Sequence, residues 1–67
     1  MKITLNNRIE YFEEDGLTFE ELFLIKKFSF KMLVTKLNGQ LVKKEDRGTT
    51  QIHEGDDVTV LHLVSGG

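Results

Sequence analysis

The residues best suited to chemistry in this sequence are Gly66 and Gly67, because they end in a carboxylate. Glycine has no Cβ, so it adopts nearly any backbone conformation and lets another backbone come close. Such a tail can thread a narrow partner site, with the carboxylate of Gly67 as the reacting group and the rest of the chain presenting it. A frayed, glycine-rich terminus is the alternative interpretation of the same two residues.

Other kinds of reactive site lack the residues they need. The chain has no Cys, and His53 and His62 fall on different expected elements, so the sequence argues against a metal site. No Gly-rich loop joins a strand to a helix, so we do not expect the chain to bind ATP or another cofactor itself. Because no convergent set of catalytic residues is visible, we expect a protein on which enzymes act, not an enzyme.

Length and charge limit the class of protein. A chain of 67 residues forms one domain, which we expect to span 1–67 and to draw its stability from a compact apolar core. The formal net charge of −2 argues against a general affinity for nucleic acid or for an anionic membrane. No stretch has the length of a membrane span and no signal peptide opens the chain, so we expect a cytoplasmic location.

The first elements expected are two strands that form a hairpin. Apolar and polar residues alternate over 1–5 and again over 8–12, which is the period of a β-strand. Asn6 and Asn7 lie between them, and Asn tolerates the left-handed conformation that a tight turn requires. Residues 13–16 predict a loop.

A helix is predicted over about 19–27. Thr18 and Glu21 have the spacing of a capping box, in which each side chain satisfies a free backbone amide at the start of a helix. Leu24 and Phe28 lie off the apolar stripe of this helix. They are therefore candidate residues for docking a partner, and the alternative is that they cover the edge of a loop.

A second hairpin is predicted over 32–37 and 40–42, because Asn38-Gly39 is a strong hairpin-turn signal. Residues 43–50 mix both signs of charge and predict a solvated loop. The sequence leaves two choices for the inward face of the first of these strands, Met32 with Val34, or Leu33 with Thr35 and Leu37.

The last predicted strand, 58–64, is apolar almost throughout. Val58 and Val60 share one face, whereas Leu61 and Leu63 share the other. This conflict predicts either a β-bulge or a strand buried on both faces, with both leucines in the core. Two residues near the end of this strand are candidates for partner docking, His62 and Val64, although His62 is also typical of an ordinary strand surface.

Assembled in order, these elements predict an α+β domain with two layers. A mixed sheet of four to five strands would pack on one helix, and the last strand would lie beside the first.

This order, together with an apolar last strand that runs into Gly-Gly, resembles the ThiS family of sulfur-carrier proteins, which have the ubiquitin-like β-grasp fold. The matching stretches are 1–5, 17–22, 37–42 and 54–67. Family members often have Pro where this chain has Lys43, and often an aromatic residue in the loop that here holds Arg47-Gly48. These departures leave the particular pathway open.

The resemblance implies that Gly67 is the reacting residue. A carboxylate is a poor electrophile, so an E1-like adenylyltransferase would use ATP to convert it to an acyl-adenylate, from which a sulfur donor makes a thiocarboxylate. That sulfur would pass to thiazole synthase in thiamine biosynthesis, or to another sulfur-accepting synthase. Ser65 and Gly66 would thread the partner's site within a flexible tail, 65–67, that spans only roughly 10 Å.

Three other functions remain open at this point. The chain resembles the small subunit of molybdopterin synthase in fold and tail, so a sulfur carrier for that pathway is one alternative. A ubiquitin-like modifier, joined through Gly67 to a lysine of its target, is the second. A non-catalytic interaction module with an inert tail is the third. In each case we expect a free monomer, which suits a carrier that visits two partners.

Overall fold

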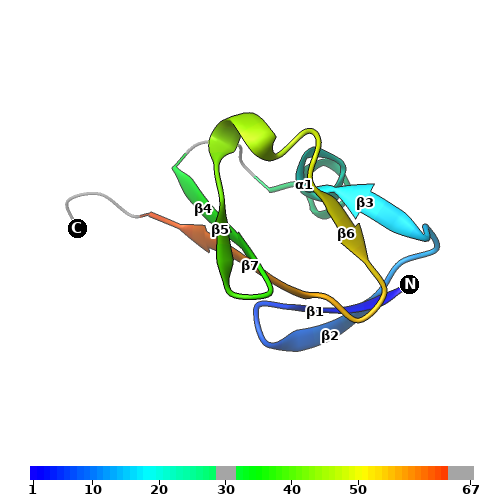
Figure 1. The fold of residues 1–67 in the computed structure, drawn as a ribbon. Helices are drawn as coiled ribbons and strands as arrows, with labels where there is room; N and C mark the ends of the chain where they lie inside the picture. Colours follow the sequence, from blue (N-terminus) through cyan, green and yellow to red (C-terminus); the bar gives the residue numbers. More distant parts are fainter. Residues whose placement is uncertain (29–31, 64–67) are drawn as a thin grey trace.

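The structure is a computed structural model that describes residues 1–28 and 32–63. Their elements are, in chain order, β1 (Lys2–Leu5), β2 (Arg8–Tyr11), β3 (Gly16–Thr18), α1 (Phe19–Lys26), β4 (Leu33–Leu37), β5 (Gln40–Val42), the 3₁₀ helix η1 (Lys44–Asp46), β6 (Gln51–His53) and β7 (Asp57–His62) (Figure 1). No helix in the described part of the chain has the length and hydropathy to cross a membrane.

The main sheet has five strands in the order β2-β1-β7-β4-β5, so the last strand lies in the middle. β1 and β7 are parallel, with Thr4 opposite Asp57, whereas β1–β2, β4–β5 and β4–β7 are antiparallel. This mixed sheet, packed on α1, is the ubiquitin-like β-grasp arrangement that the sequence predicts. The expected place of the last strand beside the first is also confirmed.

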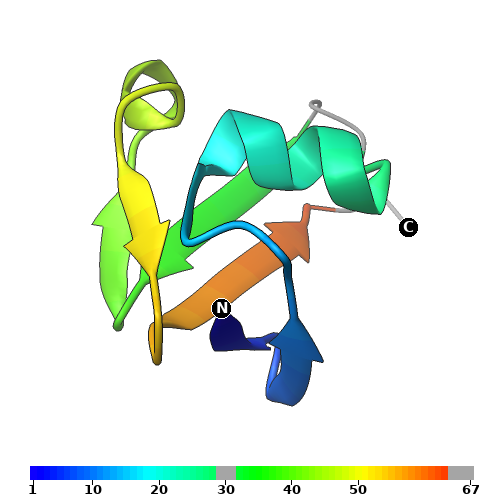
Figure 2. The same cartoon turned by 90° about the vertical axis from the view of Figure 1, so that its right-hand side faces the viewer.

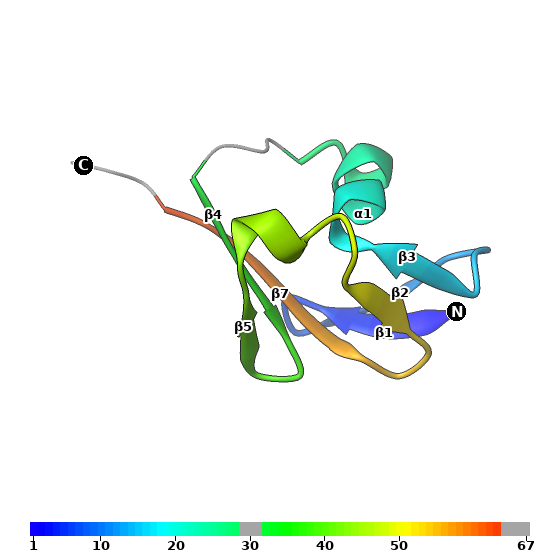
Figure 3. The same cartoon turned by 45° about the horizontal axis from the view of Figure 1, so that its top comes forward.

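The helix α1 lies across one face of this sheet (Figure 2), and the core fills the space between them. The other face of the sheet carries no second layer in the described residues (Figure 3). The core consists of buried apolar side chains from both layers, namely Ile3, Leu5, Leu17, Phe19, Leu22, Phe23, Leu33, Val42, Ile52, Val58 and Val60.

The start of α1 is set by the capping box that the sequence predicts. The amide of Glu21 donates to Thr18 Oγ1 at 3.1 Å, and the amide of Thr18 donates to Glu21 Oε1 at 2.8 Å. Each bond satisfies a backbone amide that the first turn leaves without a partner. The helix ends at Lys26, and Lys27 caps it in the left-handed conformation with φ 58°.

A second, small sheet pairs β3 with β6, with Leu17 opposite Ile52. The predicted loop over 13–16 is therefore wrong at Gly16, which begins β3. Strands of three residues are too short to show an alternating pattern, and this pairing joins segments far apart in the sequence.

The inward face of β4 consists of Leu33, Thr35 and Leu37, of which the first two are buried and Leu37 is half-buried against the core. This decides between the two faces that the sequence leaves open. The side chain of Val34 points to the opposite face and is half-buried, and Met32 is exposed.

The register of β7 against β4 is continuous from Leu37–Val58 to Leu33–His62, so the expected β-bulge is wrong. Burial on both faces is also wrong: Leu61 is 51% exposed and Leu63 is 54% exposed, which corrects their placement in the core. The reason is that α1 covers only the face that carries Val58 and Val60. The side chain of Leu61 points to the uncovered face.

The segment 43–50 is mostly exposed, as its charges predict, but it is not an irregular loop throughout. It contains η1, and Arg47 is only 7% exposed. Its Nη2 donates to the Leu33 carbonyl at 2.6 Å, its Nε donates to Thr35 Oγ1 at 3.1 Å, and its Cζ lies 5.7 Å from the centre of the Phe23 ring. Arg47 therefore satisfies the Leu33 carbonyl, which lies beyond the end of β5, and bonds the Thr35 hydroxyl, which itself donates to the Val42 carbonyl of β5 at 2.7 Å.

Candidate functional site

The predicted site lies at the C-terminal end of the middle strand. The structure describes the chain to Leu63, directly after β7. The predictions for Gly67, Gly66, Ser65 and Val64, and for a flexible tail over 65–67, fall outside the described residues. The described part fixes the point from which these four residues start.

One edge of β7 is held by β4 as far as the strand extends. The ladder reaches the pair Leu33–His62, and the amide of Leu63 then donates to the Met32 carbonyl at 2.7 Å. The base of the tail is therefore attached to the sheet through its backbone up to Leu63. Because backbone bonds of this kind do not depend on side-chain type, the sequence pattern did not show how far they continue.

The other edge of β7 is held by β1 and then by one side chain, that of Asn6. The backbone N–H of Asn6 donates to the Val58 carbonyl at 2.9 Å. Its side-chain Nδ2 donates to the Val60 carbonyl at 3.0 Å, and its Oδ1 accepts from the Val60 N–H at 2.9 Å. Asn6 thus continues the pairing of β1 with β7 after its own backbone has turned away, with φ 51°. The sequence alone predicts Asn6 only as a turn former.

The three docking candidates that the structure describes differ in their surroundings. His62 is exposed at the end of β7, and Leu24 is 70% exposed on α1. Phe28 is half-buried against the core, and its ring meets that of Phe23 edge to face at 6.1 Å. Leu24 belongs to α1, which lies across the sheet, whereas His62 is the last residue of β7 in the sheet itself.

An apolar surface that the sequence analysis missed lies on the uncovered face of the sheet. Val34 is directly opposite Leu61, and Leu41 is opposite Lys36 on the next strand. Leu41 and Leu61 are exposed and Val34 is half-buried. We call these three residues the outer-sheet patch. Exposed apolar groups that gather on one face are typical of a protein-binding surface.

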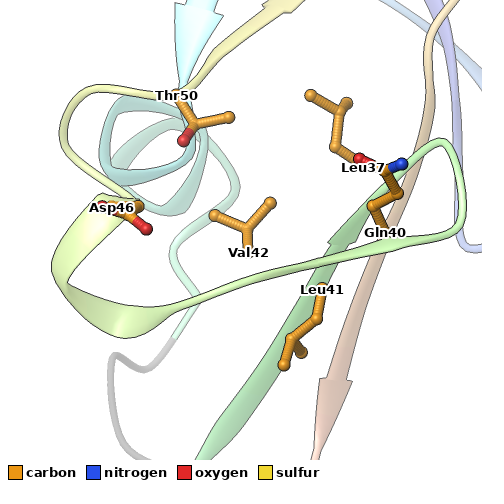
Figure 4. A pocket seen from close by; sticks show the side chains of 6 residues that line it. All are labelled: Leu37, Gln40, Leu41, Val42, Asp46 and Thr50. Atoms are coloured by element: carbon orange, nitrogen blue, oxygen red, sulfur yellow. The ribbon is translucent and has the colours of Figure 1, made fainter.

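A hollow of about 230 Å³ lies between the β4–β5 hairpin and the segment that follows η1 (Figure 4). Asp46 is its one carboxylate and Thr50 its one hydroxyl, and no His or Lys side chain lines it. In the two described ranges, no three His, Asp or Glu side chains group in a way that could hold a metal ion. The residues that line the hollow are Leu37, Gln40, Leu41, Val42, Asp46 and Thr50.

Comparison with known proteins gives one family and close structural relatives. The model of the ThiS family matches residues 3–67. The crystal structure of the thiamine biosynthesis protein ThiS from Geobacter metallireducens has a TM-score of 0.89 and 26% identity, with 100% of each chain covered. A solution NMR structure of a thiamine biosynthesis protein from the same organism has a TM-score of 0.82 and 26% identity, covering 100% of this chain and 88% of that one. No curated protein matches the sequence significantly.

Proposed function

The chain belongs to the ThiS family, and from that premise we propose that it is a sulfur carrier that serves thiamine biosynthesis. The observation that carries the proposal is the position of β7. This strand lies in the middle of the sheet and leads, within four residues of Leu63, to the carboxylate of Gly67. The body of the protein thus holds the base of a short glycine tail in a fixed place.

The proposed chemistry takes place on the carboxylate of Gly67. One of its oxygens attacks the α-phosphorus of ATP on an E1-like adenylyltransferase, which releases pyrophosphate and forms an acyl-adenylate. A donor of sulfide-level sulfur then attacks the carbonyl carbon through that sulfur; the new C–S bond replaces the C–O bond to AMP, which leaves, and the product is a thiocarboxylate. The sulfur of a thiocarboxylate is a softer and stronger nucleophile than a carboxylate oxygen, so it can be handed on.

The proposed acceptor is thiazole synthase, and catalysis in both steps belongs to the partner enzymes. The chain has no Cys that could hold sulfur, so the C-terminal carbonyl is the place left for it. ATP is used by the adenylyltransferase. This use of ATP favours a cytoplasmic location for the carrier.

The length of the tail limits how the partners approach. Val64 to Gly67 adds four residues after Leu63, and a fully extended chain spans at most about 13–14 Å over that length. An enzyme that holds the Gly67 carboxylate must therefore also lie against the end of β7. Gly66 and Ser65 are small enough to pass through a narrow entrance to such a site.

The test is an intact mass of the protein purified from its own cells, followed by fragmentation of its C-terminal peptide. We expect part of the population to carry one sulfur in place of one oxygen at Gly67, and a chain that lacks Gly67 to carry none. An unmodified acid, even after incubation with ATP, a sulfur donor and the host's adenylyltransferase, would contradict the proposal.

Two further readouts separate the related functions. Deletion of the gene should produce a requirement for thiamine, whereas loss of molybdenum enzymes would assign the carrier to molybdopterin synthesis. Conjugates of higher mass, with Gly67 joined to lysines of other proteins, would indicate a ubiquitin-like modifier.

A further inference from the structure

The edge of β7 beyond Asn6 presents backbone groups that have no strand opposite them in the described residues. Successive residues of an antiparallel strand direct their N–H and C=O groups to opposite edges. Val58 and Val60 direct theirs toward β1, where Asn6 bonds the Val58 carbonyl and both polar groups of Val60. The N–H and C=O of His62, two residues further on, therefore face the same edge.

The residue that follows His62 confirms this alternation. The amide of Leu63 bonds the Met32 carbonyl on the β4 side at 2.7 Å, so the polar groups of His62 point away from β4. On the β1 side the strand ends at Leu5, and the chain turns away through the Asn6-Asn7 turn. His62 is thus the first position on that edge that neither β1 nor the Asn6 side chain covers.

We propose that an extended segment of the adenylating enzyme pairs with this edge, through hydrogen bonds to the N–H and C=O of His62. This inference rests on the proposed function, because it names how that partner engages the carrier. The N–H of His62 can donate to, and its C=O can accept from, the backbone of an extended segment. Hydrogen bonds of this kind are the basis of recognition by strand addition. Apolar side chains of the same segment would contact Leu61 and Leu63, which are both about half exposed.

The short tail places any enzyme that holds the Gly67 carboxylate beside this edge, and the adenylating enzyme is the first to hold it in the proposed chemistry. The enzyme that binds the Gly67 carboxylate has part of its chain within about 13–14 Å of Leu63, hence beside His62. Ser65, Gly66 and Gly67 carry almost no side chain, so nothing in the sequence obstructs a partner backbone that continues along them. The Asn6 side chain already bonds both polar groups of Val60 on this edge. A partner strand can therefore pair with β7 from His62 onward, but not at Val60.

The test compares His62→Pro with His62→Ala. Proline removes the N–H that faces the open edge, and it is tolerated where that N–H serves no ladder bond. Alanine removes the imidazole and keeps the N–H. We expect His62→Pro to weaken binding of the host adenylyltransferase about tenfold relative to His62→Ala, as the loss of about one hydrogen bond predicts. Equal affinities for the two variants would overturn the inference.

Amide hydrogen exchange tests the same bond in the unaltered chain. We expect the His62 amide to exchange fast in the free protein and slowly in the complex, whereas the Leu63 amide, already bonded to Met32, is protected in both. Unchanged exchange at His62 in the complex contradicts the inference. So does protection of His62 at high protein concentration without enzyme, which would assign the edge to a second copy.

These outcomes are distinct from failure of the proposed function. If Gly67 is adenylated and thiolated but His62 is unaffected, only the pairing is wrong. If the enzyme protects His62 but Gly67 is never modified, the pairing is right and the sulfur chemistry is wrong.

Discussion

The side-chain amide of Asn6 bonds both backbone polar groups of Val60, with Nδ2 to the carbonyl at 3.0 Å and Oδ1 from the N–H at 2.9 Å. The variant Asn6→Ala leaves both groups of Val60 without these partners, so we expect it to lower the free energy of unfolding by about 1–3 kcal/mol. Urea denaturation measures the loss.

Asn7→Ala is the matched control, because Asn7 also has a positive φ, 67°, while no side-chain hydrogen bond to Val60 depends on it. Both variants place alanine in a left-handed conformation, so the difference between them isolates the two amide bonds. If Asn6→Ala and Asn7→Ala lower the free energy of unfolding equally, the bonds to Val60 contribute nothing to stability.

The guanidinium of Arg47 bonds the Leu33 carbonyl of β4, which has no partner in β5, and it also bonds the Thr35 hydroxyl. Arg47→Met keeps an apolar stem but removes every donor, and we expect a loss of about 1.5–3 kcal/mol in the free energy of unfolding. Lys44 is an exposed cation of the same segment. Lys44→Met should change the free energy of unfolding by no more than about 0.5 kcal/mol. A loss from Arg47→Met as small as that of Lys44→Met would contradict this role for Arg47.

The ion pair between Glu10 of β2 and Lys26 of α1, at 2.6 Å, joins the two layers near the surface. Their side chains are 28% and 31% exposed, so solvent screens the attraction. A double-mutant cycle of Glu10→Gln and Lys26→Met should give a coupling free energy of about 0.5–1 kcal/mol. This coupling should shrink as salt is added; a coupling that salt leaves unchanged would mean that charge is not its source.

Leu22 and Leu24 are neighbours on α1 with opposite surroundings. Leu22 is fully buried and Leu24 is 70% exposed. Leu22→Ala should lower the free energy of unfolding by about 2–5 kcal/mol, because it leaves a cavity in the core. Leu24→Ala should change it by no more than about 0.5 kcal/mol; thermal or urea unfolding of the two variants compares them directly.

Adenylation of Leu24→Ala then separates the two interpretations of this exposed side chain. A slower rate at unchanged stability would assign Leu24 to the partner surface. A large loss of stability would instead show that Leu24 covers the edge of a loop.

The elements that the sequence predicts well are those whose signals are local. Thr18 and Glu21 form the predicted capping box, and the Asn38-Gly39 turn has the positive φ angles, 51° and 84°, that its residue types favour. Such features depend on residues at most a few positions apart, so a single sequence contains all the information they need. The apolar alternation of 1–5 likewise places Ile3 and Leu5 in the core.

The features that the sequence did not predict depend on distant partners. The burial of Arg47 follows from β4 groups that extend past β5, and the bonds of Asn6 join it to a residue more than fifty positions away. Leu61 is exposed because α1 covers only one face of the sheet, which an apolar run cannot show. For the candidate site, residue types pointed to Gly67, but only the strand pairing shows that the edge at His62 is open.

The place of β7 in the sheet also has a consequence for synthesis of the protein. In the main sheet β7 joins the β1–β2 pair to the β4–β5 pair, and among the described strands it comes last in chain order. A chain that stops before Asp57 cannot connect these two halves, and its exposed strand edges and apolar faces mark it for proteolysis. Translation therefore has to come within about ten residues of Gly67 before the sheet can close. A chain that stops before β7 therefore cannot persist as a folded but tailless competitor for the enzymes that need the tail.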